Sequence, residues 1–79
     1  MMSEAAAPLI MYVVYCRPAD YPESYVVRRW GIGPGYVRPE AVPLAVVPTL
    51  RRARAEIPEG LTHHRRQPGD DPVIVEVWF

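Results

Sequence analysis

Three apolar segments stand out along the chain, and each predicts a β-strand. Residues 9–16 (LIMYVVYC) are apolar throughout, and a run this short without polar alternation is typical of a strand covered on both faces. We therefore expect it at the centre of a sheet. Residues 24–30 (SYVVRRW) predict a second strand and residues 72–79 (PVIVEVWF) the last one. Strict alternation in this last strand places Ile74, Glu76 and Trp78 on one face and Val73, Val75, Val77 and Phe79 on the other.

The segments between these strands are shorter and interrupted. Residues 31–35 (GIGPG) predict a glycine-rich hairpin loop, because glycine adopts backbone angles that other residues avoid. Residues 36–43 contain Pro39 and Pro43, so a strand there must lie at an edge of the sheet. Residues 44–47 and 61–66 predict two more short strands, and residues 67–70 (QPGD) have the pattern of a type II turn.

One helix is predicted over residues 49–57. Thr49 follows a proline as a candidate N-cap, Leu50, Ala53 and Ile57 recur at helical spacing, and residues 58–60 (PEG) end the helix. The sequence thus predicts an α+β fold, a small, mostly antiparallel sheet of four or five strands with one short helix on one face. Residues 1–8 are expected to be a flexible N-terminal tail, and residues 9–79 a single domain.

The length of 79 residues limits what the chain can do. A domain of this size buries only about 60% of the surface that its unfolded chain exposes, which leaves little room for a deep cleft. A non-enzymatic protein is therefore favoured over an enzyme. Five valines and tyrosines are expected in the core: Val13, Tyr15, Val27, Val75 and Val77.

The residues with reactive or metal-binding side chains do not form a recognisable site in the sequence. His63 and His64 are adjacent in a predicted strand, so their side chains point to opposite faces and cannot readily share a metal ion. Residues 31–35 are followed by Tyr36-Val37-Arg38-Pro39 rather than by the helix that a phosphate-binding loop needs. Cys16 is the single cysteine, so no internal disulfide is expected. The sequence indicates neither a metal nor a cofactor, and without a secretory signal or a long apolar run it predicts a cytoplasmic location.

Charge is balanced overall but not locally. The nine cationic residues, all arginine, equal the nine acidic ones in number, yet residues 51–66 carry a net charge of +3 and residues 67–79 a net charge of −3. The candidate interaction surface is formed by the arginines of the first of these segments: Arg51, Arg52, Arg54, Arg65 and Arg66. Such a surface suits a host protein or a nucleoprotein complex as partner, and direct binding to nucleic acid is the less favoured alternative. No membrane partner is expected.

Self-association is also expected. A small domain with about half of its residues apolar leaves apolar surface to cover, and pairing of two copies covers it. The candidate seam of such a homodimer is the last strand, with Ile74 and Trp78, and Cys16 as a covalent alternative.

Two blocks of the chain carry a resemblance. Residues 15–30 (YCRPADYPESYVVRRW) and 68–78 (PGDDPVIVEVW) resemble small proteins from phage-like regions of high-GC bacteria, to which no activity is assigned. In size and context such proteins are similar to anti-CRISPR inhibitors. The resemblance implies a phage-derived binding protein of the bacterial cytoplasm that blocks a CRISPR–Cas surveillance complex stoichiometrically. It transfers no catalytic residue. Because the chain is neutral, it would not act as a DNA mimic.

Overall fold

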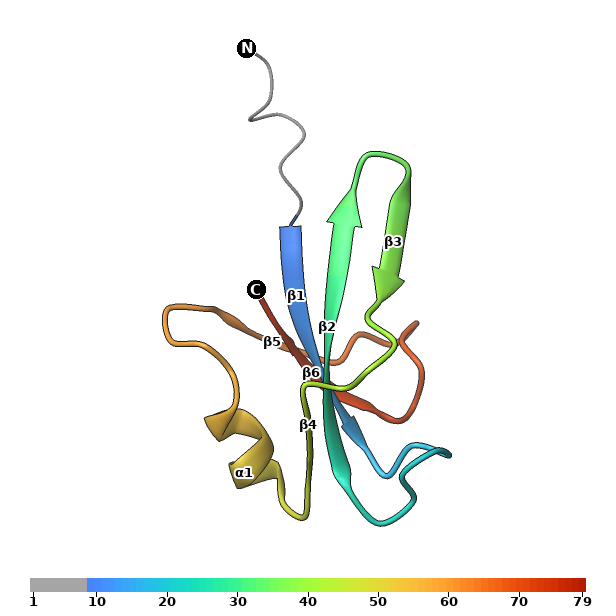
Figure 1. Cartoon of the computed structure of the whole chain (residues 1–79), viewed down its shortest axis with the longest axis vertical. Coiled ribbons are helices and arrows are strands. Elements are labelled where there is room, and N and C mark those ends of the chain that lie inside the picture. The colour runs from blue at the N-terminus through green and yellow to red at the C-terminus, as the bar shows by residue number, and fades with distance from the viewer. Residues whose placement is uncertain (1–8) are drawn as a thin grey trace.

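The computed structural model describes residues 9–79, and the tail expected over residues 1–8 lies outside them. The described chain forms one antiparallel sheet and one short helix (Figure 1). The strands are β1 (Leu9–Cys16), β2 (Tyr25–Gly33), β3 (Tyr36–Pro39), β4 (Ala45–Val47), β5 (His63–Arg65) and β6 (Ile74–Trp78), and the helix is α1 (Leu50–Ala55). The predicted α+β fold is confirmed.

The strand order is β3-β2-β1-β6-β5, and β4 pairs with β2 beyond the end of β3. β1 is therefore the central strand, as its apolar sequence predicts. All eight of its residues pair with β2, from Leu9 opposite Ile32 to Cys16 opposite Tyr25. Residues 12–15 of β1 also pair with β6. The first residues of β1, the second half of β2 and β3 extend beyond the rest of the sheet as a three-stranded arm (Figure 1).

Helix α1 covers one face of the sheet at the end away from the arm. Thr49 is the N-cap, as predicted, and its hydroxyl accepts a hydrogen bond from the backbone N–H of Arg52 at 3.1 Å. Ala53 packs with Val14 and Val27 in a fully buried cluster, and Leu50 and Ile57 flank it. We call this side of the sheet the helix side and the opposite side the helix-free face.

The arm is built around a tight turn between β2 and β3. β2 continues through Gly31 and Gly33, so the predicted loop shrinks to Pro34 and Gly35. Gly35 has a φ of +80°, which fits the third position of a type II turn after proline. A Cβ atom at Gly33 would lie only 2.5 Å from the ring of Tyr36, so a larger residue at this position would force the ring to move.

A β-bulge in β6 changes the predicted assignment of its faces. Val14 pairs with Glu76, but the next residue, Tyr15, pairs with Ile74, so Val75 is the extra residue. Val75 and Glu76 therefore both lie on the helix side, where Val75 packs against the buried cluster. The prediction that Ile74 shares a face with Glu76 and Trp78 is wrong, because uninterrupted alternation does not allow for an inserted residue.

The predicted turn type at residues 67–70 and the predicted list of core residues differ in detail from the structure. The turn at residues 67–70 forms, with the N–H of Asp70 donating to the carbonyl of Gln67 at 3.0 Å. Gly69 does not have a positive φ, however, so the turn is not of type II. Of the five expected core residues, Val13 and Val27 are buried, whereas Tyr15, Val75 and Val77 are only partly buried.

Candidate interaction surfaces

The five candidate arginines do not form one surface. Arg51 and Arg52 are exposed in the first turn of α1, and Arg65 is exposed in β5. Their guanidinium groups make no hydrogen bond or ion pair with residues 9–79. Arg66 is partly buried and donates to the backbone carbonyls of Asp70 and Asp71, which fastens the turn between β5 and β6. Arg54 is bound to Glu76, so three of the five remain free to meet a partner.

Glu76 is the one charged residue that is fully buried in the described part of the chain. Arg54 binds its carboxylate at both oxygens, with Nε 2.9 Å from Oε2 and Nη2 2.7 Å from Oε1. The indole N–H of Trp78 donates to Oε2 at 2.8 Å, and Nε2 of His63 lies 3.0 Å from Oε1. A buried carboxylate is stable only when it is paired in this way, and here the pairing joins α1, β5 and β6.

The pKa of Glu76 reflects this environment. Burial of the carboxyl raises its pKa, but the hydrogen bonds from Arg54, Trp78 and His63 outweigh burial and lower the pKa from 4.5 to about 2. Glu76 is therefore ionised at neutral pH, and the Arg54 guanidinium that it holds has a raised pKa. Sequence reasoning assigned Arg54 to a partner surface because the spacing of Arg54 and Glu76 in the chain gives no sign that they meet.

Half of the helix-free face is closed by loops of the chain itself. Arg28 extends across it, donating to Asp20 at 2.9 Å and to the carbonyl of Ala41 at 2.8 Å. The indole N–H of Trp30 donates to the hydroxyl of Tyr15 at 2.9 Å. Beneath these contacts Val26 is completely buried.

The other half of the helix-free face is open. The register places Leu9 beside Ile32 and Val37, and Met11 beside Trp30, all on this face. Val77 and Phe79 of the last strand segment continue the same surface, and His64, opposite Val77, borders it. We call these residues the open patch: Leu9, Met11, Trp30, Ile32, Val37, Val77 and Phe79. Leu9, Val37 and Phe79 are 48%, 61% and 41% exposed, respectively.

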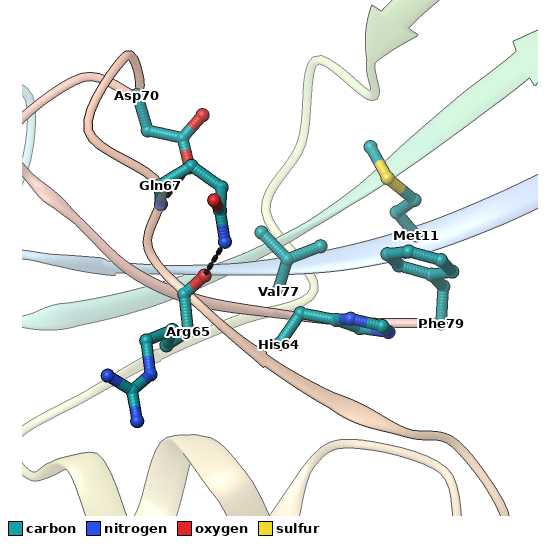
Figure 2. A pocket seen from close by; sticks show the side chains of 7 residues that line it. All are labelled: Met11, His64, Arg65, Gln67, Asp70, Val77 and Phe79. Atoms are coloured by element: carbon teal, nitrogen blue, oxygen red, sulfur yellow. Dashed lines mark hydrogen bonds between the residues drawn. The ribbon is translucent and has the colours of Figure 1, made fainter.

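A cavity of about 280 Å³ lies at the edge of the open patch. Its floor is apolar, from Met11, Val77 and Phe79, and the imidazole of His64 stacks on the Phe79 ring at a centroid distance of 4.0 Å. Figure 2 shows Gln67 and Asp70 at the rim, with the Gln67 amide bonded to the carbonyl of Arg65. The Arg65 guanidinium points away from the cavity, which leaves an apolar hollow with a short polar border.

The three residues of the expected dimer seam lie apart. Trp78 is on the helix side, bonded to Glu76, and Ile74 is on the helix-free face opposite Tyr15. Cys16 is a free, partly buried thiol at the end of β1, paired with Tyr25. The neighbouring Cys16 thiol raises the pKa of the Tyr25 hydroxyl. Ile74 and Trp78 therefore lie on opposite faces of the last strand, and the pairing of two copies through this strand stays a prediction.

His63 and His64 point to opposite sides of the sheet, as predicted, since His63 contacts Glu76 and His64 contacts Phe79. Within residues 9–79 no three histidine, cysteine or acidic side chains gather as a metal site would require. The open patch was missed because the order of residues in β6 does not specify which of its two faces α1 covers. Its signal in the sequence was the run of residues 9–16, which is apolar on both faces.

Among the helices of the described residues, none has the length and apolar character to cross a bilayer. Comparisons of the chain with protein-family models, with curated proteins and with solved structures gave no match.

Proposed function

We propose that this chain is a non-enzymatic binding protein that associates stoichiometrically with a macromolecular complex in the cytoplasm of a bacterial host. The observation that supports this proposal is the exposure of Arg51 and Arg52, which have no partner among residues 9–79. Arg51 lies in the first turn of α1, which contains no acid, although the helix dipole favours acids there by about 0.3–1 kcal/mol per charge. Residues placed against a local preference mark a surface selected for something other than stability.

The proposed contact surface comprises Arg51, Arg52 and Arg65. The register sets Arg65 opposite Glu76, on the same side of the sheet as α1. Guanidinium groups bind carboxylates and phosphates in a bidentate manner, so three free arginines on one side suit an acidic partner. Arg54, held by Glu76, supports this surface from beneath, because it fixes α1 to β6.

Capture from a host lysate by immobilised protein tests this proposal. We expect the double variant Arg51→Glu/Arg52→Glu to lose a complex that the unchanged protein retains. The variant Arg17→Glu/Arg38→Glu changes the net charge equally at exposed positions outside the surface, and it should keep the complex. If all three proteins capture the same set of molecules, the assignment of this surface is wrong.

The narrower hypothesis is an anti-CRISPR inhibitor, which is supported by the resemblance of the two sequence blocks. Adding the purified chain to a CRISPR–Cas surveillance complex tests it directly. We expect the chain to bind the complex at a fixed ratio and to abolish either its target binding or its cleavage. A complex that keeps full activity with the chain in excess would contradict the hypothesis.

Binding to nucleic acid remains the alternative, because the same three arginines can meet phosphates. Three neutralised phosphates would make the logarithm of affinity fall with the logarithm of salt concentration at a slope of about −3. Titration of labelled DNA and RNA with the chain measures this slope. Nuclease treatment of the captured complex separates the two cases, since a protein partner survives it.

A further inference from the structure

We propose that the cavity at the edge of the open patch binds a small aromatic amine, with the aromatic body on its apolar floor and the ammonium group at its polar border. A free amine and the N-terminal aromatic residue of a polypeptide share this chemistry. The proposal does not rest on the proposed function, because the cavity lies on the helix-free face and the free arginines lie on the helix side.

The floor of the cavity favours a flat, apolar body. The side chains of Met11, Val77 and Phe79 bring only carbon and sulfur atoms to it. The imidazole of His64 stacks on the Phe79 ring with the two planes 8° apart, so the pair forms an aromatic wall. Aromatic rings pack well against other rings and against the thioether of methionine. A volume of about 280 Å³ holds about nine water-sized groups at roughly 30 Å³ each, which is the size of one ring with a short side chain.

The border of the cavity offers hydrogen-bond acceptors and one negative charge. Asp70 forms no ion pair within residues 9–79. Its Oδ2 accepts the backbone N–H of Gln67 at 3.0 Å, which leaves Oδ1 without a donor in the described chain. The Gln67 amide nitrogen donates to the carbonyl of Arg65 at 3.2 Å, so the amide oxygen also has no donor there (Figure 2). Two open acceptors, one of them charged, favour a ligand group that has several donors and a positive charge.

The apolar and polar parts of the cavity are separated by the length of a small ligand. Figure 2 shows Gln67 and Asp70 on one side of Val77, and Met11 and Phe79 on the other. A ligand that spans Val77 therefore places its ring beside Met11 and Phe79 and its ammonium group beside Asp70. An acid with the same body would instead bring a second negative charge to the Asp70 carboxylate, which is why the site selects an amine.

Titration of the chain with phenethylamine, followed by the methyl resonances of Met11 and Val77 in NMR spectra, tests the proposal. At about pH 8 a primary amine is cationic. We expect both methyl groups to shift and to saturate with a dissociation constant of about 1 mM or less. The methyl group of Ala53, buried on the helix side, should not shift. Phenethyl alcohol and hydrocinnamate have the same body with a neutral or a negative head, and they should bind at least about 10-fold more weakly.

Replacement of Asp70 by asparagine removes the charge and retains an oxygen that can accept from Gln67. Asp71→Asn is the matched control, because Asp71 is exposed, does not line the cavity and accepts the backbone N–H of Val73 in a similar turn contact. Asp70→Asn should weaken phenethylamine binding about 10-fold or more, whereas Asp71→Asn should weaken it about 2-fold or less.

Three results overturn the proposal: no saturable shift at Met11 and Val77, equal affinity for the amine, the alcohol and the acid, or an equal effect of Asp70→Asn and Asp71→Asn. If Asp70→Asn does not fold, the comparison of the three ligands on the unchanged chain decides alone.

Phenylalanine amide separates the two sources of the ligand. Tighter binding than that of phenethylamine assigns the site to the N-terminus of a polypeptide, and weaker binding assigns it to a free amine. The proposed function fails separately, because Arg51→Glu/Arg52→Glu should keep the affinity for phenethylamine.

Discussion

Replacement of Arg54 by alanine tests the buried pair that ties α1 to the sheet. It removes two of the four hydrogen bonds to the Glu76 carboxylate and its permanent positive neighbour. Glu76 stays buried with a negative charge that only Trp78 and His63 contact. The expected result is a large loss of folding stability at neutral pH.

The magnitude follows from two independent estimates. The pKa of Glu76 is lowered from 4.5 to about 2, so its partners favour the ionised carboxylate by roughly 3 kcal/mol after the opposing effect of burial is overcome. Breaking a buried ion pair costs about 3–5 kcal/mol, but the Arg54 side chain is 49% exposed, so solvent screens part of its interaction. We therefore expect Arg54→Ala to cost about 2–3 kcal/mol, which lowers the melting temperature of a domain this size by roughly 10–20 °C.

Thermal and urea unfolding followed by circular dichroism, at one fixed protein concentration, measure this loss. Arg51→Ala is the matched control, because it removes the same side chain from the same helix at an exposed position. It should change stability by about 0.5 kcal/mol or less, or stabilise the helix slightly by removing a cation from its first turn.

A double-mutant cycle with Glu76→Gln isolates the ion pair. Without the carboxylate, Arg54→Ala should cost about 1 kcal/mol or less, since no buried charge is left unpaired. If Arg54→Ala costs no more than Arg51→Ala, or costs the same with and without the Glu76 carboxylate, the interaction does not hold α1 in place and the reasoning fails.

Three further predictions concern stability. Because the pKa of Glu76 is lower in the folded chain than in the unfolded chain, the stability that Glu76 contributes is complete above about pH 4.5 and is lost as the pH falls towards 2. Measurement of the folding free energy against pH should therefore show a decline between these values that is absent in Glu76→Gln. Gly33→Ala should lower the melting temperature by several degrees, because the added Cβ meets the Tyr36 ring at 2.5 Å, and adding Tyr36→Ala to this variant should recover part of the loss. Equal melting temperatures for Gly33→Ala and the unchanged chain would contradict the close contact. Val14→Ala should cost about 2–3 kcal/mol because Val14 is completely buried, whereas Val42→Ala at an exposed position should cost little, and similar values for the two would place the core elsewhere.

Hydrophobic patterning predicted the central strand, the neighbouring strands and the capped helix because each depends on local residue order. The uninterrupted apolar residues 9–16 indicate a buried strand without reference to any other segment. Thr49, a good N-cap residue after a proline, likewise indicates where the helix starts. The bulge at Val75 depends instead on how β6 pairs with β1, which the residues of β6 alone do not specify. One inserted residue was enough to place Ile74 on the wrong face.

The candidate surface was predicted only in part, because the exposure of a residue follows from local residue order but the pairing of distant side chains does not. Arg51 and Arg52 are exposed because they lie in the first turn of an amphipathic helix, a position that the sequence defines. Arg54 lies only two residues further along, and its role depends on a carboxylate 22 residues away in the chain. Pairing of side chains over such a separation is a property of the tertiary structure.

The two tryptophans of the chain provide an intrinsic optical reporter for each side of the sheet. Trp78 donates its indole N–H to the Glu76 carboxylate on the helix side, and Trp30 donates to the Tyr15 hydroxyl on the helix-free face. A charged acceptor and a neutral acceptor perturb the indole excited state differently, so emission from the two sites should be distinguishable in single-tryptophan variants. A partner that docks on the free arginines would alter Trp78 fluorescence, whereas a molecule that covers the open patch would alter that of Trp30. The fold thus carries its own probe of which surface is occupied, without an attached dye.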